Sequence, residues 1–93
     1  MNYLVEHNEV KSRFEAIINN EVSIVNYTQD ENGEILVTHT RVPRELEGRG
    51  IAAALTKAVF EYAQKRSVKV RPLCSYTKAY VKRHPEYNHL IAS

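Results

Sequence analysis

Residues 42–52, VPRELEGRGIA, mark the point at which the periodicity of the chain changes. Before this stretch apolar and polar residues alternate as in β-strands, and after it apolar residues recur at helical spacing. Pro43 ends the strand because it has no N–H for a ladder hydrogen bond. Gly48 and Gly50, separated by one residue, let the backbone approach a ligand closely. The stretch therefore predicts a strand–turn–helix junction.

The start of the predicted helix has the features of an anion site. The first N–H groups of a helix have no partner within it, and they carry a partial positive charge. Arg44 and Arg49 add charge nearby, so this turn can hold phosphate oxygens. Glycines before a helix also commonly do no more than form a turn, and spacing alone leaves both interpretations open.

Upstream, the pattern predicts β-strands joined by short turns. A turn signal at residues 30–33, Asp-Glu-Asn-Gly, separates the last two strands. In the last strand the alternation places Ile35, Val37 and His39 on one face. The expected strands are Tyr3–Glu6, Arg13–Ile18, Val22–Tyr27 and Ile35–Val42.

Downstream, the spacing predicts a long helix over Arg49–Arg66. A short strand is expected at Val68–Leu73, where Pro72 indicates an edge position or a bulge. Ser75 is the expected cap of a second helix that runs to about Arg83 and ends before Pro85, and Glu86–Ser93 has no clear pattern. The prediction is an α+β fold in a single domain, residues 1–93, with one mixed sheet of about five strands.

Composition narrows the possible functions. Hydrophobic residues make up 43% and charged residues 26%, and the formal net charge is +2. The basic residues are dispersed, so nucleic acid is not an expected partner. We expect a cytoplasmic protein, because Cys74 is a lone cysteine and no apolar run is long enough to span a membrane. The histidines show no metal-ligand spacing, so no metal is expected.

The segment Glu47–Ala52 resembles the acyl-CoA signature of the GNAT acetyltransferases, Gln/Arg-x-x-Gly-x-Gly/Ala. Gly50 and Ala52 match the signature, whereas Glu47 stands where Gln or Arg is usual. The resemblance implies that backbone amides here cradle the pyrophosphate of acetyl-CoA (or coenzyme A). The implied cofactor-binding residues are Thr40, Val42, Glu47, Gly48, Arg49, Gly50, Ile51 and Ala52.

A closer resemblance is to the small GNAT-like N-acetyltransferases of about ninety to a hundred residues, often labelled YjdJ-type. It is carried by residues 39–43, 48–52, 55–63, 72–76, 80–81 and 84–87. This resemblance implies a minimal GNAT fold, with a long cofactor-binding helix and a short C-terminal helix. It also implies that the pantetheine arm enters beside Thr38–Val42. The amine acceptor is not identified, and a monomer or weak dimer is expected.

Three side chains are candidates for chemistry. Cys74 precedes a predicted helix, where a thiolate is favoured, although a lone cysteine is more commonly a buried apolar residue. His39 lies near the implied carbonyl-binding backbone at Val42 and could act as a base; Glu45 is the alternative base. Tyr80 corresponds by resemblance to the tyrosine that protonates coenzyme A, and Tyr76 could exchange roles with it.

These features leave three functional hypotheses. The leading one is an N-acetyltransferase that uses acetyl-CoA and acts either directly or through an acyl-cysteine at Cys74. The second is a non-catalytic acyl-CoA-binding module. The third is a protein-interaction or nucleic-acid-associated domain, whose footprint would be the basic strip Lys78, Lys82, Arg83 and His84.

Overall fold

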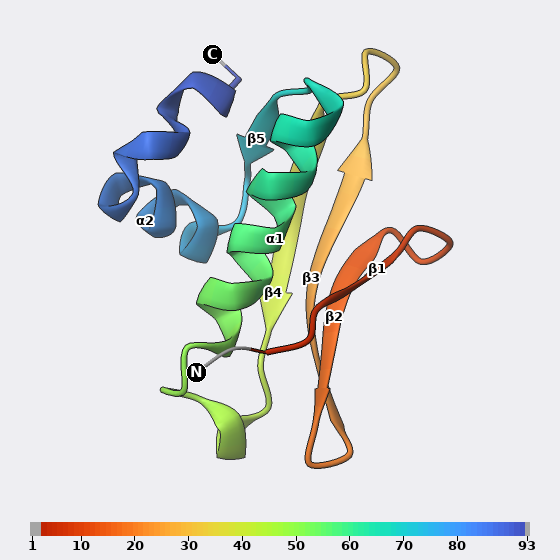
Figure 1. The fold of residues 1–93 in the computed structure, drawn as a ribbon, viewed down its shortest axis with the longest axis vertical. Coiled ribbons are helices and arrows are strands. Elements are labelled where there is room, and N and C mark those ends of the chain that lie inside the picture. The colour runs from red at the N-terminus through yellow and green to blue at the C-terminus, as the bar shows by residue number, and fades with distance from the viewer. Residues whose placement is uncertain (1–2, 93) are drawn as a thin grey trace.

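The computed structural model describes residues 3–92, which form a five-stranded sheet with helices packed on one face (Figure 1). The expected α+β fold is confirmed. The strands lie in chain order across the sheet, and α1 connects β4 to β5. The elements are β1 (Glu6–Asn8), β2 (Arg13–Ile18), β3 (Glu21–Gln29), β4 (Ile35–Arg41), the 3-10 helix η1 (Arg44–Leu46), α1 (Ile51–Arg66), β5 (Val70–Pro72), α2 (Ser75–Arg83) and the 3-10 helix η2 (Pro85–Leu90).

The sheet is an antiparallel meander with one parallel edge. β1 to β4 pair antiparallel with their neighbours, and β5 pairs parallel with β4. A parallel pair needs a crossover connection, and α1 supplies it. Pro72 lies at the end of β5, the edge strand, so of the two alternatives that the sequence left open, an edge position or a bulge, the structure has the edge position.

The core lies between the sheet and α1. Alternate strand residues such as Phe14, Val25 and Val37 are buried, because every second side chain of a strand points to the same face. α1 covers them with Leu55 and Val59, both fully buried. On the opposite face Ile17 and Val22 are exposed, and no helix of residues 3–92 covers that face (Figure 1).

A β-bulge in β4 corrects one expectation. Tyr27 pairs with Val37 and Asn26 pairs with His39, so Thr38 is an extra residue without a partner on β3. The bulge shifts the alternation by one residue. His39 therefore lies on the uncovered face and not on the face of Ile35 and Val37, as the unbroken alternation had placed it. Thr40 pairs with the buried Val25 of β3, so its side chain lies on the inner face of the sheet.

Several boundaries also differ from those expected. The first strand is Glu6–Asn8 and not Tyr3–Glu6, because Glu6 to Asn8 are the residues that pair with β2. β5 is shorter than Val68–Leu73, since only Val70–Pro72 pair with β4. α1 begins at Ile51, two residues after Arg49. Gly50 is its N-cap and adopts a φ of 79°, in the left-handed region, which does not continue a right-handed helix.

The C-terminal tail, which showed no pattern in the sequence, completes the core. Leu90 is buried at the end of η2, and Tyr87 stacks on Phe60 of α1 with ring centroids 4.9 Å apart. Ile91 forms an isolated parallel bridge with Val70. The tail thus packs against both α1 and β5.

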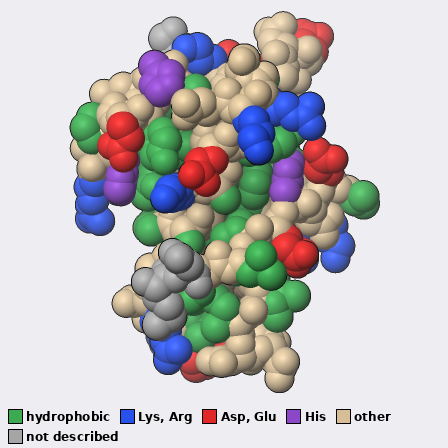
Figure 2. All heavy atoms as spheres, in the orientation of Figure 1, with side chains coloured by type: hydrophobic (Ala, Val, Ile, Leu, Met, Phe, Trp, Pro, Cys, Tyr) green, Lys and Arg blue, Asp and Glu red, His purple; other side chains and the backbone are tan. Residues whose placement is uncertain are grey.

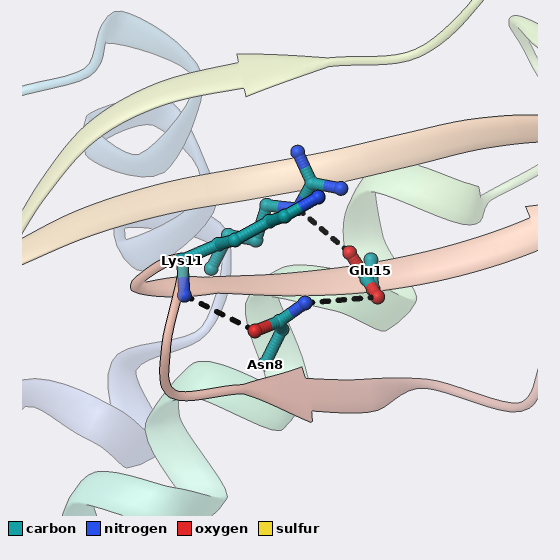
Figure 3. Close-up of polar contacts among 4 residues, drawn as sticks. Asn8, Lys11 and Glu15 are labelled. Carbon is teal, nitrogen blue, oxygen red and sulfur yellow. Dashed lines mark hydrogen bonds and ion pairs between the residues drawn. The ribbon is translucent and has the colours of Figure 1, made fainter.

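The β1–β2 hairpin is held by a polar network on its edge (Figure 3). Arg13 Nε donates to Glu15 Oε2 at 2.6 Å, and Asn8 Nδ2 donates to the other carboxylate oxygen at 3.5 Å. The Lys11 amide donates to Asn8 Oδ1 at 3.1 Å. The hydrogen bond from Arg13, which outweighs partial burial, lowers the pKa of Glu15. The network fixes the turn that joins the two strands.

Candidate active site

A cavity of about 370 Å³ lies at the junction between β4 and α1. It brings together every cofactor-binding residue expected from the sequence except Arg49. It is lined by Thr40, Val42, Leu46, Glu47, Gly48, Gly50, Ile51, Ala52, Ala53 and Tyr76. The cavity therefore joins the end of a strand, the glycine turn and the first turn of two helices.

The first turn of α1 faces this cavity with unpaired donors. The first intrahelical hydrogen bond runs from the Ala54 amide to the Gly50 carbonyl, at 3.1 Å. The amides of Ile51, Ala52 and Ala53 therefore have no partner in the helix. No side chain caps them, and the first turn has no acidic residue. The positive end of the helix dipole is left uncompensated, which favours a bound anion.

The glycines keep the entrance to this turn open. Gly48 and Gly50 have φ values of 80° and 79°, and a Cβ at either position would meet no atom within 4 Å. Glycine is thus required for the backbone conformation and not to avoid a clash with the protein itself. The space beside them is available to a ligand.

The N-terminal segment holds the turn from outside. Tyr3 Oη donates to the Arg49 carbonyl at 2.6 Å, across 46 positions of the chain. No local sequence signal predicts this contact, because it depends on where the chain runs after leaving the sheet. Tyr3 therefore supports the residue that precedes the helix cap.

Beyond Val37 the neighbouring strands separate. β5 pairs only with Ile35–Val37, and the Leu73 and Cys74 amides then both donate to the Val37 carbonyl, each at 3.0 Å. The remaining residues of β4 have no partner on β5 within residues 3–92. This leaves backbone groups available beside Thr40 and Val42, which line the cavity.

Cys74 contacts the wall of the cavity. Its Sγ lies 3.4 Å from Thr40 Oγ1, and the residue is half-buried as the N-cap of α2. Partial burial raises the pKa of the thiol, but the Thr40 hydroxyl and the backbone N–H groups of Thr77 and Tyr76 outweigh it, so the net pKa is lowered. A thiol with a lowered pKa forms a thiolate more readily, and the thiolate is the nucleophilic form.

The structure brings Tyr76 to the cavity and does not bring Tyr80 there. Tyr80 is 6% exposed and lies against α1, with its ring 6.1 Å from that of Phe60 and 4.1 Å from that of His84. Burial raises its pKa to about 12. Tyr76, one turn earlier on α2, lines the cavity.

His39 and Glu45, the two predicted bases, are exposed and do not line the cavity. His39 lies on the uncovered face because of the bulge, and Glu45 lies in η1. Sequence reasoning missed Thr40 as the hydrogen-bond partner of Cys74. The bulge that turns Thr40 inward has no signal in the sequence.

Within the described part of the chain, no three His, Cys, Asp or Glu side chains are arranged to hold a metal ion. Over the same residues, none of the helices combines the length and the apolar character that a membrane crossing requires.

Comparisons with known proteins agree with this geometry. Residues 13–90 match the family model described as GCN5-related N-acetyl-transferase. Protein NATD1 of Xenopus tropicalis is 30% identical over 83 residues, covering 87% of this chain and 76% of that protein. Protein NATD1 of Homo sapiens is also 30% identical over 83 residues, covering 87% of this chain and 74% of its own length.

A solved structure shares the whole fold. The solution NMR structure of a GCN5-like protein from Staphylococcus aureus superposes with a TM-score of 0.77 at 28% identity, covering 99% of this chain and 90% of the other. The chain belongs to the GCN5-related N-acetyltransferase (GNAT) family, whose members generally use acetyl-CoA.

Proposed function

We propose that this chain binds acetyl-CoA in the cavity and transfers its acetyl group to an amine. The observation that carries the proposal is that one cavity joins free amides at the start of α1 to an unpaired stretch of β4. The thiol of Cys74, whose pKa is lowered, does not line the cavity itself but lies 3.4 Å from the hydroxyl of Thr40, which does. The amides of residues 51–53 would hold the pyrophosphate. The pantetheine arm would follow the unpaired edge at Thr40 and Val42, as an added strand does.

In the proposed route the acetyl group passes through Cys74. The Cys74 thiolate attacks the thioester carbonyl, so a bond from Sγ to the acetyl carbon forms and the bond to the coenzyme A sulfur breaks. The Val42 amide is the proposed donor to the carbonyl oxygen as negative charge develops on it. The Thr40 hydroxyl donates a hydrogen bond to the sulfur of Cys74 when that sulfur is a thiolate. This hydrogen bond stabilises the thiolate, which is the form that attacks.

Proton transfers complete the proposed cycle. Burial raises the pKa of Tyr76, so its hydroxyl stays protonated at neutral pH and can donate a hydrogen bond to the departing sulfur. Tyr80, the acid implied by family resemblance, does not line the cavity and would need to move to reach the departing sulfur. His39 remains a proposed base for an amine that approaches from the uncovered face of the sheet. The amine then attacks the acyl-cysteine and releases the thiolate.

The route is tested by intact-mass spectrometry of the protein after brief exposure to acetyl-CoA. The wild type should gain the mass of one acetyl group and lose it when a reactive amine is added, whereas Cys74→Ala should gain none. Transfer to amines by Cys74→Ala at the wild-type rate would contradict the acyl-cysteine and indicate direct transfer. Binding of acetyl-CoA with no transfer to any amine would indicate an acyl-CoA-binding protein instead.

A further inference from the structure

One buried hydroxyl of α2 has no hydrogen-bond partner. Thr77 is fully buried, and its Oγ1 makes no hydrogen bond within residues 3–92. Figure 2 views the molecule from the side of α1, and it shows hydrophobic side chains gathered over the middle of this face with charged and histidine side chains around them. Thr77 is not part of that surface, because none of its area is exposed. A polar group buried without a partner is costly, so this hydroxyl requires an explanation.

A second buried threonine, in α1, shows what Thr77 lacks. Thr56 is 1% exposed, and its Oγ1 donates to the Ala52 carbonyl, one helical turn earlier, at 2.8 Å. This bond to the preceding turn is the usual partner of a threonine hydroxyl inside a helix. Thr77 makes no such bond, although it too lies in a helix and is buried. The proton of the Thr77 hydroxyl is therefore free for another acceptor.

The position of Thr77 in α2 directs its side chain toward Cys74. Cys74 is the N-cap, and Thr77 is the third residue of the helix. A side chain at this position leans toward the helix N-terminus, and in a capping box it accepts from the amide of the N-cap residue. Here that amide donates to the Val37 carbonyl at 3.0 Å, and the Cys74 carbonyl accepts from the Lys78 amide at 3.0 Å. The sulfur is the polar atom of Cys74 that remains for Thr77.

Loss of the thiol proton would supply the missing acceptor. In the structure the Cys74 thiol donates to Thr40 Oγ1 at 3.4 Å, and a neutral sulfur accepts hydrogen bonds only weakly. A thiolate is charged, so it accepts hydrogen bonds much more strongly. Partial burial raises the pKa of Cys74, whereas the side chain of Thr77 is among the groups that lower it. The hydroxyl without a partner and the ionisation of the thiol are thus coupled.

We infer that Thr77 is a positioning residue for Cys74, and that its hydroxyl donates a hydrogen bond to the thiolate that attacks the thioester. The inference rests on the proposed function and assigns to its nucleophile a second hydroxyl donor. Thr40 reaches the sulfur from β4, and Thr77 reaches it from the first turn of α2. Two donors from different elements fix the direction of the thiolate as well as its charge. Thr77 does not line the cavity, so it acts on the substrate only through Cys74.

The test is the pH dependence of Cys74 alkylation by iodoacetamide in the whole chain, without acetyl-CoA. Thr77→Val removes the hydroxyl and keeps the backbone amide and nearly the same shape. It should slow alkylation several-fold at neutral pH and move the midpoint of the pH–rate profile upward. Thr77→Ser keeps the hydroxyl and loses only a methyl group, so it should restore the wild-type midpoint. A role in packing alone would instead make Thr77→Ser the more disruptive change.

Thr56→Val is the matched control for this series. It makes the same substitution at a buried helical threonine whose hydroxyl bonds the Ala52 carbonyl and not the sulfur. It should therefore leave the midpoint of the alkylation profile where the wild type has it. Thr77→Val is expected to fold, because it replaces a buried hydroxyl that has no partner with a methyl group. Thermal melts of both variants check that each remains folded over the range of pH used.

Each other outcome has a defined meaning. A midpoint for Thr77→Val equal to that of the wild type would overturn the inference and leave the proposed function intact. A midpoint for Thr77→Ser that stays with that of Thr77→Val would do the same. Uptake of an acetyl group from acetyl-CoA, followed by intact mass, should slow in Thr77→Val in step with alkylation. A wild type that takes up no acetyl group would refute the proposed route, and the role of Thr77 in it.

Discussion

At the scale of single residues, one hydroxyl controls the chemistry of the only cysteine. Cys74 follows a strand and caps a helix, and the sequence alone suggested that its thiolate would be favoured. The structure adds Thr40, whose Oγ1 lies 3.4 Å from Sγ and lowers the pKa of the thiol against the effect of partial burial. Both side chains meet because β4 and β5 separate just where α2 begins.

Removing that hydroxyl should raise the pKa of Cys74. In Thr40→Val the thiolate fraction at neutral pH falls, so alkylation by iodoacetamide should slow several-fold, and the midpoint of its pH–rate profile should move upward. Thr38→Val is the matched control, since the Thr38 hydroxyl bonds the Asn26 carbonyl and not the thiol. A profile for Thr40→Val that overlays the wild type would show that Thr40 does not tune the thiol.

At the scale of elements, the turn at residues 47–52 was predictable and the bulge was not. Gly48 and Gly50 indicate a turn, at which the structure finds positive φ, and the change from alternating to helical spacing locates the end of β4. The bulge at Thr38 follows from how β4 fits between β3 and the diverging β5, and Thr38 is an ordinary strand residue. One unpaired residue therefore moved His39 to the other face and brought Thr40 into the cavity.

The packing of the C-terminal tail is a second feature that the sequence pattern does not predict. Residues 85–90 form η2, whose apolar side chains have no regular period, so their packing could not be inferred from spacing. Leu90 and Tyr87 nevertheless contact the core formed by α1 and β5. The end of the second helix, by contrast, was predicted, because Pro85 stops it after Arg83. Its cap was not: Ser75, the expected cap, is the first residue of the helix, and Cys74 is the N-cap.

Truncating the buried side chain of η2 should destabilise the fold. Leu90 is 6% exposed, so Leu90→Ala leaves a cavity and should lower the free energy of unfolding by about 2–4 kcal/mol. Val10→Ala serves as the control, because Val10 is 95% exposed and its truncation should change little. Urea denaturation measures the free energy of unfolding of each variant. An equal change in Leu90→Ala and Val10→Ala would mean that η2 is not part of the cooperative core.

At the scale of the whole molecule, His7 connects the first strand to the rest of the fold. Its Nε2 lies 2.6 Å from Tyr27 Oη, and its ring stacks on Phe14 and meets Tyr62 edge-on. Burial lowers the pKa of His7; the charge of Glu9 opposes this shift, and that of Arg66 adds to it. The folded state therefore favours the neutral form of the ring.

Stability should consequently fall as the pH decreases through about 6.5, the value for an unfolded histidine. At such a pH His7 is protonated more readily in the unfolded chain than in the folded chain, because its pKa is lower in the folded chain. Protonation therefore moves the equilibrium toward unfolding. Thermal melts between pH 7.5 and pH 5.5 should show this decrease, and His7→Phe, which keeps the stacked ring, should flatten it. A slope unchanged in His7→Phe would show that another group is responsible.

The most direct test of the central claim is a calorimetric titration with coenzyme A of the wild type, Gly50→Asp and Gly50→Asn. Asp and Asn have nearly the same shape and tolerate the left-handed backbone comparably, so they differ mainly in charge. We expect micromolar binding by the wild type, roughly −8 kcal/mol, retained in large part by Gly50→Asn. Gly50→Asp should abolish it, because its carboxylate occupies the free amides and repels phosphate. Wild-type affinity in Gly50→Asp would contradict the assignment of this turn as the pyrophosphate site.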